Sequence, residues 1–483
     1  MPSRTTPSEL PAMDAVALQG QIRGRKVSCV EVMAACLDQI ETLNPKVNAI
    51  VALRERGELL AEAQARDDAL ARGEQVGPLH GFPFAVKDLQ PVKGIRTTQG
   101  SPLFRDVVPD ADSLSVERLR KAGAIFIGKT NTPEFGLGSH TYNPVHGVTR
   151  NPYDLSRSAG GSSGGAAVGL ALRMVPLADG SDYGGSLRNP AGWNNVFGFR
   201  PSIGRVPSDG ADVWLPTMAV TGPMARNVAD LALLLSVQAG YDSRAPLSMA
   251  ADSQVFDELP DEGLKGKRIA WAGDFNGHAP HEPEILDICR RALKALEGLG
   301  CIVEEALPDY PPDRAWRAFT QIRASQQTAL LPYYNDPASR KLIKPEAIFE
   351  IESGMKLTAF DVAAASAIRS EWYQAMRRLF EAYDYFIAPT SQTFPFDVDL
   401  TWPREIAGRR METYHEWMKA NCLISMSGCP ALAAPAGFNA QGLPIGIQIV
   451  APFRGEAACL QLASAYERAT ECSARLPPLL QRG

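Results

Sequence analysis

Four residues in this sequence have side chains suited to acyl-transfer chemistry: Lys87, Ser162, Ser163 and Ser186. A serine hydroxyl attacks a carbonyl carbon only when a base accepts its proton. A lysine can be that base once burial lowers its pKa from about 10.4 to roughly 7 or 8. Lys87 lies in the apolar segment FAVKDL, where a strand would bury it. Because most lysines reach water, an edge-strand lysine without a catalytic role is the alternative.

Glycines surround all three serines. Ser186 ends the segment DYGGS, and the other two serines lie in GGSSGG. Because glycine tolerates backbone dihedral angles that other residues avoid, DYGGS can turn successive N–H groups toward one point and form an oxyanion hole. GGSSGG precedes an Ala-rich segment typical of a helix, and a turn there would place Ser162 between Lys87 and Ser186. For either segment alone, a tight turn without chemistry is the simpler alternative.

Two other motif matches lack the structure that their chemistry needs. GAIFIGKT (123–130) fits the phosphate-binding expression G-x-x-x-x-G-K-[ST], but its four intervening residues predict a buried strand instead of a loop. GGSSG fits the nucleophile elbow of α/β-hydrolases, but a loop precedes it, and His415 is the only histidine late in the chain. His278 and His281 have a spacing that could bind metal in an expected surface loop, but no carboxylate pattern supports it. We therefore predict no cofactor and no metal.

The elements that must position these residues alternate between strands and helices. Residues 8–75 are expected to be helical, with Ser28 and Glu31 in capping-box spacing and a helix end before Asn44-Pro45. We then expect strands at 81–89, 123–130, 267–273, 301–308 and 383–390, helices at 113–123 and 282–300, mostly helical structure at 313–384, an irregular loop at 390–405, and two C-terminal strands around a turn at 439–442. Strands alternating with helices predict a largely parallel sheet covered on both faces.

Composition excludes several classes of protein. The 483 residues are 45% hydrophobic and 21% charged, as in an ordinary globular protein. The net charge of −5 suggests no nucleic-acid or membrane-surface partner, and no run of about 18 apolar residues predicts a membrane-spanning helix. The eight cysteines show no C-x-x-C pair, and no secretory signal is visible. We therefore expect reduced, mostly buried thiols in a cytoplasmic protein.

Together these segments resemble the amidase signature family. Lys87 precedes Ser162 by 75 residues, and Ser186 follows Ser162 by 24, as in that family. The resemblance covers LHGFPFAVKDL (79–89), GAIFIGKTNTPEFGLGS (123–139), TRNPYDLSRSAGGSSGGAAVGLAL (149–172), GSDYGGSLRNPAGWNNVFGFRPSIGRVP (180–207), TGPMARNVADLALLL (221–235) and GLPIGIQIV (442–450).

The family implies an α/β fold with a large mixed, mostly parallel central sheet covered by helices on both faces. We expect one domain over 1–483, and divide it into an N-terminal helical segment (1–75), a catalytic core (77–240), a variable, mostly helical substrate-side region (260–420) and C-terminal core strands (425–455). The absence of a linker between these parts favours one unit.

The resemblance also implies a role for each site residue. Ser186 matches the nucleophile, Ser162 the serine that bridges through a cis peptide bond, and Lys87 the terminal base. The oxyanion hole is implied to be the backbone N–H groups of Tyr183, Gly184, Gly185 and Ser186. Ser163, Asp182 and Arg188 match supporting positions, and Gly136, Leu137 and Ser139 match a stretch that borders the acyl pocket. The family usually has Thr or Ile at the place of Tyr183, which could therefore crowd or line the pocket.

The resemblance leaves the substrate open. We favour a free-standing hydrolase of a small-molecule amide, with carbamates and anilides open to the same chemistry. One alternative is the glutamine-hydrolysing A subunit of a tRNA-dependent amidotransferase. Met418 stands where that protein has an acidic residue, and 313–384 does not match its glutamine-binding stretch. The other alternative is an inactive binding protein on the same fold. Homodimers are common in the family. Aromatic residues that could line the pocket, or simply belong to the core, are Trp316, Phe319, Tyr333, Tyr334, Phe394, Phe396, Trp402, Tyr414 and Trp417.

Overall fold

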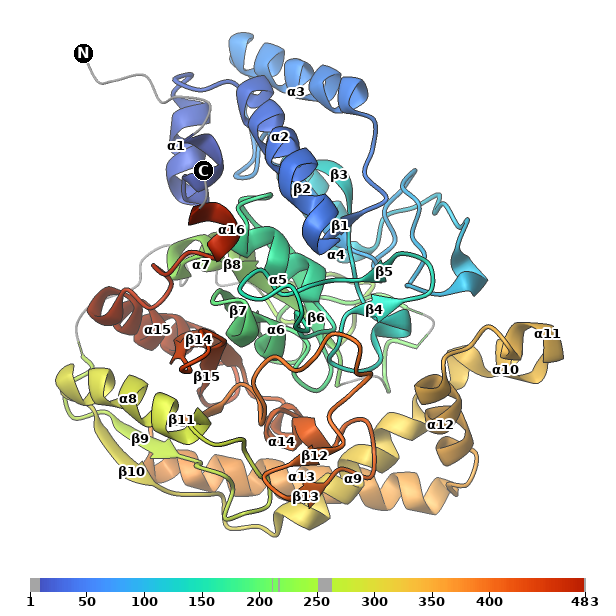
Figure 1. Ribbon diagram of the computed structural model, residues 1–483, viewed down its shortest axis with the longest axis vertical. Helices are drawn as coiled ribbons and strands as arrows, with labels where there is room; N and C mark the ends of the chain where they lie inside the picture. Colours follow the sequence, from blue (N-terminus) through green and yellow to red (C-terminus); the bar gives the residue numbers. More distant parts are fainter. Residues whose placement is uncertain (1–8, 211, 216–217, 251–262, 482–483) are drawn as a thin grey trace.

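An eight-stranded sheet forms the centre of the computed structural model, which describes residues 9–210, 212–215, 218–250 and 263–481 (Figure 1). Its strands, in spatial order, are β10 (Ile302–Glu305), β9 (Arg268–Trp271), β11 (Tyr385–Pro389), β15 (Pro444–Val450), β14 (Ala431–Phe438), β7 (Phe197–Arg200), β8 (Val220–Ala225) and β6 (Ala178–Asp182). Because one sheet takes strands from 178–225 and from 268–450, these two parts of the chain share a core. The four-part division of the domain stays a prediction.

The sheet is mixed, as predicted, but the prediction that it is mostly parallel is wrong. Among its neighbouring pairs, β10–β9 and β9–β11 are parallel, and the other five are antiparallel. A short turn after β14 returns the chain as β15, and strands joined so closely must run antiparallel. Alternation of strands and helices along the sequence does not reveal which strands become neighbours, so it could not show this.

A second sheet carries Lys87. Its strands are β1 (Ile50–Val51), β3 (Ile125–Thr130) and β2 (Pro83–Lys87), in the spatial order β1-β3-β2. β2 and β3 are parallel and fully buried, with Lys87 opposite Thr130. The free side of β2 lies beside β6, where the Lys87 N–H donates to Asp179 Oδ1 over 3.0 Å. This junction of two sheets places the lysine deep inside the molecule.

Helices cover both faces of the main sheet, as predicted. α5 (Gly164–Ala171) and α6 (Arg188–Trp193) contact one another, while α7 (Val228–Gln238), α8 (Ile285–Gly298) and α15 (Glu456–Thr470) form a separate group of contacts. Side chains alternate between the faces of a strand. On β15, Gly446 lies against α6, and Gln448 accepts a hydrogen bond from Arg188 of that helix. The isoleucines that alternate with them on β15 therefore face the opposite side of the sheet, where α8 and α15 pack.

The helical regions predicted for the N-terminal segment and for the substrate side are both present. The N-terminal helices are α1 (Ala15–Arg23), α2 (Cys29–Val47) and α3 (Arg56–Ala71). The helices between residues 312 and 427 are α9 (Pro312–Ser325), α10 (Leu331–Asn335), α11 (Pro337–Arg340), α12 (Pro345–Gly354), α13 (Ala359–Ala382) and α14 (Lys419–Ser427), of which α12, α13 and α14 pack on α9 (Figure 1). The remaining elements are α4 (Leu114–Lys121), α16 (Pro478–Gln481), β4 (Tyr142–Asn143), β5 (Gly147–Val148), β12 (Glu405–Ile406) and β13 (Arg409–Arg410). No helix in the described ranges is both long and apolar enough to cross a bilayer.

The ends of α2 and the burial of the cysteines test two local predictions. The capping box of Ser28 and Glu31 is confirmed, but α2 continues through Pro45 instead of ending before Asn44. Pro45 lies in the last turn, where its missing N–H costs one hydrogen bond to the carbonyl four residues earlier, and the helix continues for only two residues beyond it. Asn48, at φ 54°, then ends the helix in the left-handed region. All eight cysteines are free thiols, and seven of them are buried, which confirms the predicted burial.

The close approach of α5 to β3 allows us to predict how a larger side chain at Gly165 changes the free energy of unfolding. A Cβ on Gly165 would lie 2.3 Å from Asn131 N and 2.6 Å from Ala49 O, which are backbone atoms that cannot move aside. We expect Gly165→Ala to lower the free energy of unfolding by about 3 kcal/mol or more. Gly20→Ala is the matched control, because no atom lies within 4 Å of its added Cβ in α1. It should raise stability by roughly 0.5 kcal/mol. Urea denaturation measures both, and equal stability of the two variants would contradict the packing described.

Candidate active site

Lys87 ends β2 with its side chain fully buried. Its Nζ donates to Ser162 Oγ over 2.7 Å and to Ser163 Oγ over 2.9 Å, and it also contacts the hydroxyl and carbonyl oxygens of Ser181 at 3.0 and 3.3 Å. Burial lowers the pKa of Lys87 from 10.5 to about 7, although the carboxylates of Asp179 and Asp182 oppose the shift. A fully buried amine among neutral oxygens can therefore lose its proton near neutral pH.

The GGSSGG segment brings two serines to this amine. The peptide bond between Gly161 and Ser162 is cis. A Cβ on Gly161 would lie 3.0 Å from the backbone of His140, and one on Gly164 would lie 2.3 Å from Thr141 Oγ1. These glycines let the loop pack directly on the 139–141 segment, so that the Ser162 hydroxyl is buried against Lys87.

The DYGGS loop places Ser186 beside the same segment. Ser163 N–H donates to the Ser186 carbonyl over 3.1 Å, and the Ser186 side chain keeps slight exposure. In the described part of the chain, no hydrogen bond joins Ser186 Oγ to Ser162 Oγ. Catalytic hydrogen bonds are often long in unliganded enzymes, so the missing bond does not rule out the predicted pairing of these two serines, which stays a prediction.

The predicted oxyanion donors are not equivalent. Gly185, at φ +120°, donates its N–H to Asp182 Oδ1 over 2.8 Å, so this amide is already engaged. The backbone N–H groups of Tyr183, Gly184 and Ser186 have no acceptor among the residues that the structure describes. The N–H of Gly185 is therefore already engaged, whereas the other three predicted amides have no acceptor; the oxyanion hole itself stays a prediction.

Asp182 holds this loop in place. Its carboxylate accepts from Arg188 Nε and Nη2, both at 3.0 Å, and from Leu187 N–H over 3.0 Å. Arg200 Nη1 lies 3.3 Å from Oδ1. Burial would raise the pKa of Asp182, but the two guanidinium groups outweigh it and hold that pKa well below its usual range. Arg200 was not predicted from the sequence, because it lies on β7 and carries no motif of its own.

One of the three predicted acyl-pocket residues, Gly136, lies close to Ser162, and the other two line a cavity. A Cβ on Gly136 would lie 3.6 Å from Ser162 Oγ. Leu137 and Ser139 line a small cavity, and the Leu137 carbonyl accepts from Lys344 Nζ over 3.0 Å. Of the aromatic candidates, the three that line this cavity are Trp402, Tyr414 and Trp417. The structure therefore places Leu137 and Ser139 around the same cavity as three of the nine aromatic residues named from the sequence.

Tyr183 is held by two side chains at and just beyond the C-terminal end of α9, Arg323 and Gln326, which were not predicted to belong to the site. Its hydroxyl donates to Gln326 Oε1 over 3.0 Å, and Arg323 Cζ lies 4.9 Å from its ring centroid. Arg323 Nε in turn donates to Glu350 Oε1 over 2.9 Å and to the Tyr414 hydroxyl over 3.0 Å. Tyr183 and its α9 partners are far apart in the sequence, so no local signal could have indicated these contacts.

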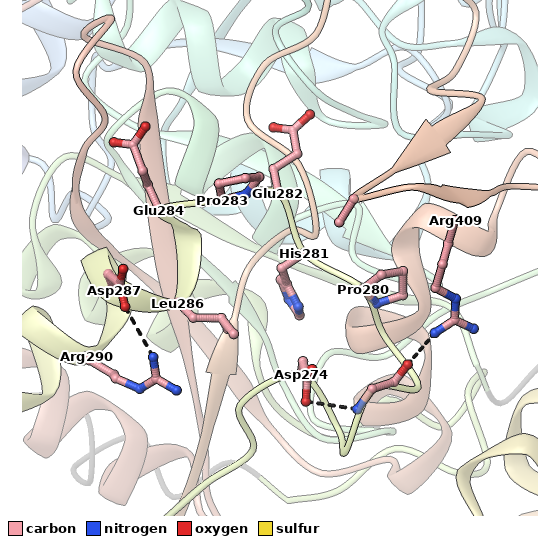
Figure 2. A pocket seen from close by; sticks show the side chains of 12 residues that line it. Asp274, Pro280, His281, Glu282, Pro283, Glu284, Leu286, Asp287, Arg290 and Arg409 are labelled. Carbon is pink, nitrogen blue, oxygen red and sulfur yellow. Dashed lines mark hydrogen bonds and ion pairs between the residues drawn. The ribbon is translucent and has the colours of Figure 1, made fainter.

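A second cavity lies elsewhere. It has a volume of about 510 Å³ and is lined by residues between 274 and 290 together with Ala407 and Arg409 (Figure 2). None of the predicted catalytic or oxyanion residues lines it, so the chemistry and the large cavity do not coincide. The expectation that His278 and His281 lie at the surface is wrong, because both residues are only 8% exposed. Arg409, from the β12–β13 hairpin, donates to Gly277 O and covers their loop.

Proteins of known activity are similar to this chain along nearly its whole length. The family described as Amidase matches residues 31–460. An acylamidase of Rhodococcus erythropolis is 34% identical over 96% of both chains. The A subunit of the glutamyl-tRNA(Gln) amidotransferase of Moorella thermoacetica is 36% identical, over 98% of this chain and 99% of its own. The crystal structure of a bacterial aryl acylamidase, described as an amidase signature enzyme, superposes with a TM-score of 0.88 at 30% identity and covers 95% of this chain and 96% of its own.

The ion cluster around Asp182 makes a second stability prediction. Removing one member of a buried ion pair leaves the partner charge uncompensated, at a cost of about 3–5 kcal/mol. We expect Asp182→Asn to lower the free energy of unfolding by that amount, because it leaves the buried charges of Arg188 and Arg200 without a carboxylate partner. Glu304→Gln is the control, because its pair with Arg268 is 43% exposed on both sides. Such exposed pairs contribute less than about 1 kcal/mol. Equal losses in urea denaturation would show that Asp182 does not anchor the loop.

Proposed function

The chain belongs to the amidase signature family of amide hydrolases, and from that premise we propose that it cleaves the C–N bond of a small-molecule amide through an acyl-enzyme on Ser186. The observation that carries the proposal is the buried Lys87 Nζ, 2.7 Å from Ser162 Oγ. In this mechanism Lys87 is the base, Ser162 is the proton relay and Ser186 is the nucleophile.

The reaction proceeds in two halves. Neutral Lys87 accepts the proton of Ser162 as Ser162 accepts that of Ser186, and Ser186 Oγ bonds to the amide carbon. The resulting oxyanion accepts hydrogen bonds from the N–H groups of Tyr183, Gly184 and Ser186. The proton returns through Ser162 to the amine nitrogen, the C–N bond breaks and the amine leaves. Water then attacks the ester by the same relay, which releases the acid and restores Ser186.

The surroundings of Tyr183 favour an uncharged substrate. Arg323 is the cation closest to this loop on α9, and its charge is already balanced by Glu350. A substrate carboxylate near Tyr183 would have to compete with that buried pair. The aromatic rings around the site suit an aryl or aliphatic acyl group. The acylamidase and aryl acylamidase relatives support this substrate class, and anilides or carbamates remain open to the same chemistry.

The second candidate is hydrolysis of glutamine as the A subunit of an amidotransferase. The 36% identity to the Moorella protein favours it. The pairing of Arg323 with Glu350 weighs against it, because glutamine carries a carboxylate and an ammonium group beside its amide. We still predict a cytoplasmic location, a homodimeric state and no nucleic-acid or membrane partner. That the protein is an active enzyme and not an inactive binding protein is likewise a prediction.

The nucleophile is tested by Ser186→Ala with an anilide substrate and a fluorophosphonate probe. We expect turnover to fall at least about 10⁴-fold and labelling to vanish, because no other group can form the acyl-enzyme. Ser370→Ala on α13 is the control and should keep both, since its exposed hydroxyl donates to Ser366 O. Near-normal turnover or labelling of Ser186→Ala would refute the assignment. A wild-type protein that neither labels nor turns over would favour the inactive binding protein.

The substrate class is tested with two anilides that share 4-nitroaniline as the leaving group. One carries an acetyl and the other a succinyl group, so they differ by a methylene and a carboxylate. We expect kcat/KM at least about 100-fold higher for the acetyl compound and negligible ammonia release from glutamine, because a buried carboxylate would lack a free partner. Equal or better hydrolysis of the succinyl compound or of glutamine would contradict the proposal and favour the second candidate.

A further inference from the structure

Asp179 is a buried carboxylate that the proposed mechanism does not use. It lies on β6 and is 1% exposed. Its Oδ1 accepts the backbone N–H of Lys87 over 3.0 Å, and its Oδ2 has no hydrogen-bond partner among the described residues. Burying an ionisable group with one unsatisfied oxygen is costly. A neutral side chain could accept the same N–H, so the hydrogen bond alone does not explain a carboxylate here.

The charge of Asp179 faces two buried amines. Lys87 Nζ has only serine oxygens as hydrogen-bond partners, and Lys129 Nζ donates to the Gln90 carbonyl and to Thr97 Oγ1. All these partners are neutral. Burial lowers the pKa of both lysines; the charge of Asp179 opposes that lowering at Lys87, and the charges of Asp88 and Asp179 oppose it at Lys129. Burial raises the pKa of Asp179 itself, and the charges of Lys129 and Lys87 oppose that rise. Among the described residues, neither amine lies within ion-pair distance of Asp179.

The other two carboxylates near Lys87 have partners of their own. Asp182, on the same strand, is neutralised by Arg188 of α6 and Arg200 of β7. Asp88, which follows Lys87 in the chain, accepts from the Thr98 N–H and hydroxyl and lies 3.5 Å from His146 Nε2. Ser162 and Ser163 from the glycine loop and Ser181 from β6 carry no charge. Among these three carboxylates, Asp179 is therefore the one with an oxygen that has no hydrogen-bond or ion-pair partner in the described residues.

We propose that Asp179 is an electrostatic tuning residue, whose buried negative charge holds the proton affinity of Lys87 high enough for it to act as a base near neutral pH. This inference rests on the proposed function, because it assigns Lys87 the role of base. Full burial without a nearby charge can lower a lysine to about pKa 5–6. So weak a base would accept the serine proton poorly, whereas a lysine with a pKa of about 7 combines availability with basicity.

The test compares Asp179→Asn with Asp230→Asn. Asparagine keeps the shape and the acceptor for the Lys87 N–H but removes the charge. Asp230 is a matched control, because it is also buried and accepts backbone N–H groups, from Ala15 and Val16, on a different element from Lys87. The rate of fluorophosphonate labelling at Ser186 is measured against pH, together with kcat/KM for the anilide.

The charge of Asp179 fixes the direction in which the labelling midpoint should move. A carboxylate stabilises the ammonium form, so its removal lowers the pKa of Lys87. The labelling midpoint of Asp179→Asn should move about one unit to lower pH, with a lower plateau because the base is weaker. Asp230→Asn should keep the wild-type midpoint. A midpoint of Asp179→Asn within about 0.2 units of wild type, with the protein folded, would overturn the inference and leave Asp179 a structural acceptor.

Two further measurements test the charge of Asp179 directly. Asp179→Glu restores the charge and should restore the wild-type midpoint, which a merely structural role does not require. In the wild type, ¹³Cγ resonances of labelled aspartate should show Asp179 ionised at pH 7, and a protonated Asp179 would overturn the inference even if the variants fail to fold. A wild-type protein that does not label at any pH refutes the proposed function instead, so the two failures are distinguishable.

Discussion

The proton affinity of one buried amine is the property on which the rest of this site depends. Lys87 Nζ has no contact with solvent, and burial brings its pKa to about 7. A direct ion pair with a carboxylate would keep the amine protonated, but its hydrogen-bond partners are hydroxyl and carbonyl oxygens of three serines, which can accept from an ammonium group and whose hydroxyls can donate to a neutral amine. The site can therefore hold either protonation state at modest cost, which is what a general base requires.

The fold serves this amine by bringing backbones unusually close together. β2 and β6 meet at the edge of two sheets, and the glycines of GGSSGG let a loop enter where side chains would collide with His140 and Thr141. A second loop is fixed from behind by Asp182 and two buried guanidinium groups. Because these anchors are buried and paired with one another, the free N–H groups keep their direction without help from substrate.

The sequence indicated the local parts of this arrangement better than its long-range parts. Lys87, Ser162 and Ser163 come together as expected, because strand burial and glycine turns are local properties. The antiparallel pairing of most strands was missed, because strand order depends on packing between distant segments. Arg200 and the α9 group around Tyr183 were missed for the same reason. Gly185 was assigned as a donor because spacing alone cannot show that Asp182 already occupies its N–H.

The most direct measurement is the titration of Lys87 itself in the full-length protein. Lysine labelled with ¹³C at Cε reports the charge of each side-chain amine by NMR, and Lys87→Met, which lacks the amine, identifies the resonance. We expect a midpoint near pH 7, because burial at the junction of β2 and β6 disfavours the charged amine. A midpoint near the ordinary value of about 10.5 would show that the amine stays charged, and would contradict its role as base.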